Sequence, residues 1–428
     1  MDAWRWLRVQ GAAVKRAQYL GASEQDLDRL ALLLLSLPAL ESAGVTLHAR
    51  PDASSAAFLA AAGLAVACCS RLQCLELVIV LTTNDYAPVV QVAEAPTLER
   101  LTAGLAGLSR LRELTLELTE DYIGGRLPAC ISCLAQLTSL SLGGIYGLRC
   151  APGWARLPAL ELLHFRLCQF AGDGEEALPG MDALVSLTSL SMFDCYGLRV
   201  FPASLWRLPQ LCSLSCWPEC GPELCDVPRG ELPVAGLPAS APCFAVFTHL
   251  TLAGYNLPAC PPGILAMRRL KQLDLSYGCF EHLPGGVSAL TALEKLRLGR
   301  HTAASAQIGG AFTAQALGSL ARFPCLRELG FNNCSVQFCA SFAAAAAHPR
   351  LELLELDSSF PTRGPSCRAF LAFVGGLLQQ GRSRVVKLCH IFPVVQGEGR
   401  RDSRNFLAAL HAVSVDEYDN YCLSDDEE

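Results

Sequence analysis

The chain has 428 residues, of which 51% are hydrophobic, and its formal net charge is −6. A net acidic charge argues against a nucleic-acid scaffold, because such a scaffold holds its ligand on a basic face. The longest apolar runs, around Leu30–Leu35 and Phe58–Cys69, are shorter than the roughly 20 residues that span a bilayer, so we expect neither a nucleic-acid partner nor a membrane span.

The 21 cysteines are an odd number and are spread over a long chain. Met1–Gly11 carries charges and two tryptophans, where a signal peptide would have an apolar centre. Secreted disulfide frameworks are short and evenly paired, so we expect free thiols in a reducing compartment. The predicted location is the cytoplasm, with the cytoskeleton and the nucleus as alternatives.

We predict that residues 1–70 form degenerate repeats, which cap the N-terminal end of the repeat array described next. The expected elements are a worn strand at Val14–Tyr19, a helix over Glu24–Leu37 capped by Ser23, a strand at Val45–Leu47 and a helix over Ser55–Val66.

Residues 71–360 repeat the pattern Leu-x-x-Leu-x-Leu, mostly every 23 to 27 residues. After a first copy at Leu72–Leu77, copies occupy residues 111–116, 137–142, 160–165, 187–192, 211–216, 247–252, 270–275, 293–298, 326–331 and 351–356. A repeat of this length indicates a solenoid whose units stack on their neighbours. Each copy predicts a short strand, in which the later motif leucines face the core and the residues between them face solvent.

Two copies carry a longer pattern, Leu-Pro-x-x-Ile/Val-x-x-Leu-x-x-Leu-x-x-Leu-x-Leu, at Leu127–Leu142 and Leu283–Leu298. This pattern resembles the leucine-rich repeats of plant-type and Ras-group proteins. The resemblance implies an α/β fold, a curved leucine-rich repeat solenoid with a parallel β-sheet on its concave face. The prolines mark where the chain turns into a short helical or 3₁₀ segment on the other side.

One position of each repeat, three residues after the last motif residue, holds a side-chain donor in several copies. The donors are Thr119, Cys168, Cys195, Cys334 and Ser359, and the departures are Ile145, Glu219, Tyr255, Gly278 and His301. We expect each donor to satisfy backbone carbonyls of its own and neighbouring turns, because unpaired buried groups are costly.

The remaining segments interrupt or end the array. We predict a Pro/Gly-rich loop insert at 218–243 and a small polar insert at Arg300–Phe312. A C-terminal capping region at 361–415 should hold a helix at Ser366–Gln380 and a last strand at Val385–Ile391. The acidic tail, 416–428, is expected to be solvated, and Ser424 is a candidate phosphorylation site because acidic residues come directly after it.

The residues that carry chemistry on the predicted strand face are aromatic, histidine and charged side chains. The candidate partner-binding residues are His164, Arg166, Phe193, Asp194, Trp217, His249, Asp274, Tyr277, Lys295, Arg297 and Arg300. Aromatic residues and arginine are frequent at interface hot spots, and Lys295, Arg297 and Arg300 form a basic patch. The alternative is that exposed strand positions hold these residues by chance.

The cysteines offer a rival interpretation, a zinc- or redox-dependent regulator. Cys212, Cys216, Cys220 and Cys225, with Cys243 nearby, have a spacing that zinc could use only if their thiolates converge. Cys216 falls on a core position, and Cys130-x-x-Cys133 lacks a redox-fold context. We therefore predict no metal and no cofactor.

Common catalytic signatures, such as Gly-x-x-x-x-Gly-Lys, His-Glu-x-x-His and Gly-x-Ser-x-Gly, do not occur. We predict a non-enzymatic protein-interaction scaffold that binds a protein partner, and not a small-molecule substrate, through its concave face. The segment from Trp4 to Val14 resembles the region directly after the F-box in some algal and plant F-box/leucine-rich proteins, and we expect the F-box itself to be lacking. This resemblance implies a role in recruiting substrates to a ubiquitin ligase. Small-GTPase or defence signalling and a cytoskeletal (ciliary) scaffold are the alternatives.

Overall fold

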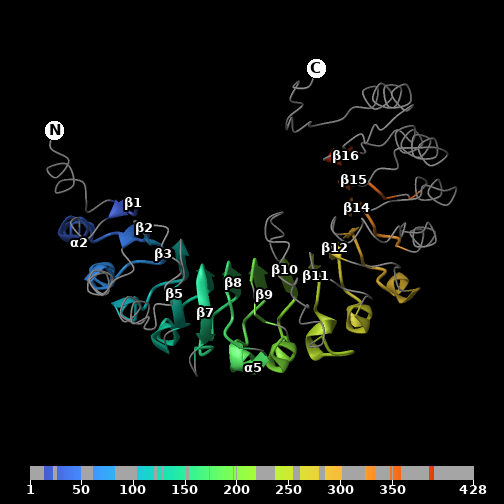
Figure 1. The fold of residues 1–428 in the computed structure, drawn as a ribbon, viewed down its shortest axis with the longest axis horizontal. Helices are drawn as coiled ribbons and strands as arrows, with labels where there is room; N and C mark the ends of the chain where they lie inside the picture. The colour runs from blue at the N-terminus through green and yellow to red at the C-terminus, as the bar shows by residue number, and fades with distance from the viewer. Residues whose placement is uncertain are drawn as a thin grey trace, which may run out of the picture. The chain divides into compact units, whose positions relative to one another are not determined.

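The computed structural model describes residues 14–22, 27–49, 61–81, 104–119, 123–127, 129–150, 154–172, 174–195, 197–198, 200–217, 237–253, 261–278, 285–300, 323–332, 348, 350–357 and 385–389 (Figure 1). The chain divides into two compact units, Met1–Val246 and Phe247–Glu428, here called unit 1 and unit 2.

Unit 1 is built on one parallel sheet in which each strand pairs with the strand of the next repeat. Its strands, in spatial order, are β1 (Arg16–Ala22), β2 (Ser42–Ala49), β3 (Cys74–Leu81), β4 (Glu113–Thr119), β6 (Ser139–Gly143), β8 (Leu162–Arg166), β9 (Ser189–Phe193) and β10 (Ser213–Trp217). The helical segments are α2 (Leu27–Leu35), η3 (Ala129–Cys133), α5 (Gly174–Ala177), η4 (Met181–Ala183), η5 (Ala203–Arg207) and η8 (Pro242–Ala245). They lie on the side of the coil opposite the strands (Figure 1).

Unit 2 repeats the same plan. Its parallel strands are β11 (His249–Leu252), β12 (Gln272–Gly278), β13 (Lys295–Arg300), β14 (Glu328–Asn332), β15 (Leu353–Asp357) and β16 (Val385–Cys389). The 3₁₀ segments η9 (Pro262–Ala266) and η10 (Gly285–Ala289) come after β11 and β12 in the chain. The predicted leucine-rich repeat solenoid is confirmed, because every motif copy lies on or directly before a strand of a parallel sheet.

The core of each unit is a stack of the motif leucines. Leu140, Leu163 and Leu214 occupy the same position in different repeats, and their side chains are fully buried. Burying one such side chain contributes roughly 1.5–3 kcal/mol. The repeat thus specifies the fold by supplying one apolar layer per turn, so that neighbouring repeats cover each other's open ends.

Prolines precede two described 3₁₀ segments on the helical side, whereas the prolines of the predicted turns, Pro128 and Pro284, lie outside the described residues. Pro202 directly precedes η5, and Pro261 directly precedes η9, both with extended backbone. On this side of unit 1, the Trp206 ring packs edge-on against Phe201 and Phe244, with ring centroids 5.6 and 5.8 Å apart. These aromatic contacts fix η5 against η8.

A second, two-stranded parallel sheet was not predicted. It pairs β5 (Ile123–Leu127) with β7 (Ile145–Cys150), which come after the main-sheet strands of consecutive repeats. Ile145 departs from the donor pattern because it begins β7, where its side chain is fully buried.

Several predicted elements are confirmed near the ends of the chain. β1 overlaps and β2 covers the worn strand motifs, α2 lies within the predicted first helix, residues 61–67 are helical, and β16 lies within the predicted last strand. Within the described ranges, no helix combines the length and the hydrophobicity that crossing a bilayer requires. Other predictions fall outside the described residues: positions 218–236 of the insert predicted at 218–243, most of the second insert, the helix predicted at 366–380, the acidic tail and Ser424. The domain boundaries stay predictions.

Candidate functional site

The outward-facing residues of neighbouring strands form rows across each sheet, because the strands pair in register. In unit 1 we call the outward residues of β3, β4, β6, β8, β9 and β10 the unit 1 sheet face. In strand order, the first row is Cys74, Glu113, Ser139, Leu162, Ser189 and Ser213; the middle row is Glu76, Thr115, Ser141, His164, Ser191 and Ser215; and the last row is Val78, Glu117, Gly143, Arg166, Phe193 and Trp217.

Two aromatic side chains stand side by side at the β9–β10 end of the last row. Phe193 is 41% exposed and Trp217 is 37% exposed. Their ring centroids lie 5.8 Å apart, with the ring planes tilted by 51°. The prediction that both residues are exposed is confirmed. Together they form an apolar surface at this end of the unit 1 sheet face, and Leu162, in the first row, is exposed to a similar extent, 39%.

Arg166 lies beside this aromatic pair and is held by an ion pair. Its Nη1 is 3.2 Å from Glu117 Oε1, although β6 separates the two strands. Gly143 of β6 leaves the room for this pair, since a Cβ there would lie 3.1 Å from Glu117 Cγ. Arg166 is therefore positioned by its carboxylate partner and remains exposed to a ligand.

The first and middle rows are lined with serine hydroxyls: Ser139, Ser141, Ser189, Ser191, Ser213 and Ser215. All six side chains are half-buried, and within the described part of the chain their hydroxyls make no hydrogen bond to protein. By contrast, Thr138 Oγ1 and Thr188 Oγ1, one residue before β6 and β9, each donate to a backbone carbonyl at 3.0 Å. The six serines thus carry donors and acceptors that a ligand could use.

His164 lies in the middle row between Ser141 and Ser191. Burial lowers the pKa of its imidazole below the ordinary value of 6.5. The ring is therefore neutral at physiological pH, with one nitrogen able to donate a hydrogen bond and the other able to accept one.

The prediction that Asp194 is exposed is wrong, because its side chain is only 2% exposed. Asp194 directly follows β9 and has a left-handed backbone, with φ at 54°. Gly144 and Leu167 hold the equivalent position in the two preceding repeats and are left-handed too. In all three, the amide donates to the carbonyl of the next strand's last residue, which for Asp194 is Trp217 O at 2.6 Å. This turn takes Asp194 off the strand face.

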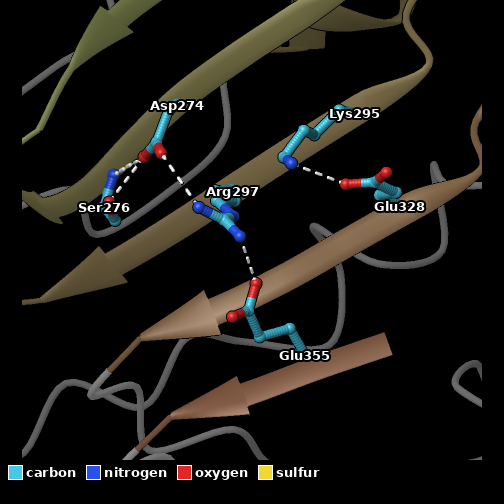
Figure 2. A network of polar contacts seen from close by, with 6 residues as sticks. All are labelled: Asp274, Ser276, Lys295, Arg297, Glu328 and Glu355. Atoms are coloured by element: carbon cyan, nitrogen blue, oxygen red, sulfur yellow. Dashed lines mark hydrogen bonds and ion pairs between the residues drawn. The ribbon is translucent and has the colours of Figure 1, made fainter. Parts of the chain in front are cut away.

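In unit 2 the equivalent face is occupied by ion pairs (Figure 2). Arg297 lies between two carboxylates, with Nη2 at 2.6 Å from Glu355 Oε2 and Nη1 at 3.9 Å from Asp274 Oδ2. Asp274 Oδ1 also accepts hydrogen bonds from the amide and the hydroxyl of Ser276, at 3.0 and 2.5 Å. A Cβ at Gly330, on the intervening strand β14, would lie 2.9 Å from Arg297 Cγ, so this pair too reaches over a glycine.

Two of the three cations of the predicted basic patch, Lys295 and Arg297, are paired with carboxylates. Lys295 Nζ lies 2.6 Å from Glu328 Oε2 on the neighbouring strand, and Arg297 is shared by Asp274 and Glu355. The predicted site residues included the two cations but not the two glutamates or Ser276. The in-register alignment of the motifs was the signal that could have found the glutamates, because it places them beside the cations.

The other predicted binding residues of unit 2 are His249, Tyr277 and Arg300. His249 begins β11, where its Nδ1 lies 2.8 Å from Thr248 Oγ1. The backbones of Tyr277 and Arg300 lie at the ends of β12 and β13, and their side chains are outside the described part of the structure.

Cys168, Cys195 and Cys216 of unit 1 carry structural roles. Cys168 Sγ donates to Leu142 O at 3.4 Å and to Arg166 O at 3.3 Å, and Cys195 Sγ donates to Phe193 O at 3.4 Å. The predicted donor role is thereby confirmed at these two positions. Burial raises the pKa of Cys216, whose side chain lies in the core as predicted. Cys220 and Cys225 are not among the described residues, and no group of three or more metal-binding side chains occurs among those that are.

No family model and no curated protein matches this sequence. Solved structures of similar fold include a leucine-rich repeat protein of Leptospira interrogans, with 17% identity and a TM-score of 0.48, covering 95% of this chain and 97% of that one. An internalin of Listeria monocytogenes has 13% identity and a TM-score of 0.48, covering 97% and 89% of the two chains. TLR13 in its complex with ssRNA13 has 17% identity and a TM-score of 0.49, covering 84% of this chain and 44% of TLR13. Similarity at this level does not bear on function.

Proposed function

Taking the leucine-rich repeat solenoid as the premise, we propose that this chain is a non-catalytic scaffold that binds a protein partner on the unit 1 sheet face. The observation that carries the proposal is the exposed Phe193–Trp217 pair. Exposed aromatic side chains on a rigid sheet contribute a large contact area at a small cost in conformational entropy, and aromatic residues are enriched at the centres of protein interfaces.

The surroundings of the aromatic pair support a protein ligand. Serine hydroxyls without protein partners among the described residues and the neutral ring of His164 lie in the adjacent rows. They can pair with the polar groups of a bound backbone, which must otherwise lose their hydrogen bonds to water. An apolar centre with polar groups around it is the composition of a protein-binding surface.

The experiment is proximity labelling in cells that express the wild-type chain, a Phe193→Ala/Trp217→Ala variant or a control variant. The control, Leu32→Ser/Leu64→Ser, removes two apolar side chains that are 59% and 63% exposed on the helical side of unit 1. We expect at least one partner to be labelled by the wild type and the control and not by the aromatic variant. Equal labelling by the aromatic variant would refute the proposal.

The pathway stays a prediction. Recruitment to a ubiquitin ligase was inferred from residues 4–14, most of which lie outside the described part of the structure. The identity of the labelled partner separates this pathway from small-GTPase, defence and cytoskeletal signalling.

A further inference from the structure

The two ends of the unit 1 sheet face differ in chemistry: one end is acidic and the other is aromatic. On β3 and β4 its charged residues are Glu76, Glu113 and Glu117, with no lysine or arginine on either strand. Within the described ranges, Glu76 and Glu113 have no ion-pair partner, and both side chains are exposed. Of these three glutamates, Glu117 is the one paired there, with Arg166. The β9–β10 end carries the aromatic pair instead.

The two ends are joined by the serine rows. Between the glutamates and the aromatic pair, the middle row holds Thr115, Ser141, His164, Ser191 and Ser215. These side chains are small or neutral, whereas the last row beside them holds Arg166, Phe193 and Trp217. The middle row is therefore a line of short polar side chains beside the longer side chains of the last row. A peptide segment could lie along this line, across the strands.

We propose that the ligand of this face is an extended segment of a partner protein that carries a basic residue at one end and a large apolar residue at the other. The basic residue pairs with Glu76 and Glu113, and the apolar residue covers Phe193 and Trp217. The inference rests on charge complementarity at one end and on exposed aromatic surface at the other. It depends on the proposed function, since it names the kind of partner that the same face binds.

The strand spacing sets the length of this segment. From β4 to β9 there are three strand steps, and from β3 to β10 there are five. At about 4.8 Å per step, the two ends lie roughly 14 to 24 Å apart. An extended chain advances about 3.4 Å per residue, so the basic and apolar residues are about four to seven residues apart in the partner. Arg16, outward-facing on β1, limits how far a basic segment can extend past β3.

The test is a selection of displayed random peptides of about 12 residues, long enough for the required span, on the immobilised full chain. We expect the enriched peptides to share a lysine or arginine and, about four to seven residues away, a tryptophan, phenylalanine or leucine. Enrichment of acidic peptides, of peptides without this spacing, or of none would overturn the inference.

Variants then connect the peptide to the face. We expect Glu76→Gln/Glu113→Gln to lower the affinity of the chain for its tightest-binding peptide by at least about tenfold. This is the effect of losing one or two charge-assisted contacts. Glu76→Lys/Glu113→Lys should instead favour the same peptide with glutamate in place of its basic residue. The matched control, Glu176→Gln/Asp182→Asn, removes two negative charges from exposed positions on the helical side of unit 1 and should leave the affinity unchanged.

The outcomes separate this inference from the proposed function. If peptide binding depends on Phe193 and Trp217 but not on Glu76 and Glu113, the partner class is wrong and the binding face stands. If peptide binding depends on neither pair, the selected peptides do not use this face and the inference fails. Proximity labelling that is also unaffected by the aromatic variant would then refute both.

Discussion

The sheet faces of the two units are built from strands with the same leucine pattern and differ in how their polar groups are used. On the unit 1 sheet face, from β4 to β10, a single described ion pair joins Arg166 to Glu117, and six serine hydroxyls have no described protein partner. On unit 2, lysines and arginines alternate with carboxylates from strand to strand. The pairs on the strands are Lys295–Glu328, Arg297–Asp274 and Arg297–Glu355. Lys271–Glu294 and Arg327–Glu352 lie one residue before the strands, as Lys15–Glu41 does in unit 1.

This difference shows that the number of charges on a surface does not measure its capacity to bind. A partner that contacts unit 2 must displace or desolvate ion pairs that already satisfy each other, and the desolvation cost offsets much of the gain. A partner that contacts unit 1 meets exposed aromatic rings and available hydroxyls. We therefore expect partner binding to depend on unit 1 and local stability of the sheet face to depend on unit 2.

The largest expected effect is on binding at unit 1. Phe193→Ala/Trp217→Ala should weaken binding of the labelled partner by more than about 2 kcal/mol, or roughly 30-fold in affinity, as truncating hot-spot aromatic residues does. Isothermal titration calorimetry with the purified partner measures this loss. In unit 2, Lys295→Gln/Glu328→Gln removes an ion pair without changing the net charge and should alter the affinity by less than about threefold. A comparable loss from both variants would erase the contrast between the units.

A smaller effect, on stability, is expected at Arg297. The variant Arg297→Met keeps most of the side-chain volume but leaves Asp274 and Glu355, which are 15% and 18% exposed, without their cation. We expect a loss of about 1–3 kcal/mol, measured as the midpoint of urea unfolding. Lys271→Met, in an exposed pair, should cost no more than about 1 kcal/mol. Adding Asp274→Asn/Glu355→Gln to Arg297→Met should recover part of the loss, and failure to recover it would point to packing instead of charge.

The serine hydroxyls give a sharper form of the comparison. Ser191→Ala and Ser215→Ala should each weaken partner binding by about 0.5–1.5 kcal/mol, the value of one hydrogen bond, without shifting the unfolding midpoint. Thr138→Val and Thr188→Val remove hydroxyls that bond to backbone carbonyls. They should therefore lower the midpoint and leave binding unchanged. The reverse result would show that the serines have partners within the chain.

The smallest expected effect is the pH dependence that His164 adds to unit 1. Burial lowers the pKa of its imidazole below 6.5 in the folded chain, so the unfolded chain takes up the proton first as the pH falls. The free energy of unfolding should therefore decrease below about pH 6.5. Urea midpoints between about pH 5 and 7.5 should show a shallower decline in His164→Asn than in the wild type. Parallel declines would show that His164 titrates as it does in an unfolded chain.

The strands and the core were predictable from the sequence because the same leucine pattern predicts both. Alternation places Leu140 and Leu142 inward, and the same residues mark the strand β6. The exposure of Phe193 and Trp217 followed from the same alternation. Turn geometry did not follow from it: Asp194 comes one residue after the alternating stretch, where a left-handed backbone redirects the side chain. Only the position of Gly144, one residue after β6, gave a hint, since glycine favours that conformation.

The state of the charges was the other part that could not be predicted from the order of residues alone. Lys295, Arg297 and Arg300 are close together in the chain and suggest a patch when they are read along it. The charge that matters lies across the sheet, where Glu328 and Glu355 come from strands more than 30 residues later. The second sheet, β5–β7, was missed for a similar reason, because its glycine-containing strands do not carry the leucine pattern.

The ion pairs that reach over Gly143 and Gly330 have a consequence for how the array folds and evolves. In a simple solenoid each repeat interacts only with its immediate neighbours, so its stability is a sum of single-repeat and adjacent-pair contributions. Arg166–Glu117 and Arg297–Glu355 connect repeats that are two apart. They add an interaction between second-neighbour repeats that a nearest-neighbour description omits. A larger residue at Gly143 or Gly330 would stand between the partners of each pair, so the glycine of the middle repeat and the charges of its two neighbours depend on one another.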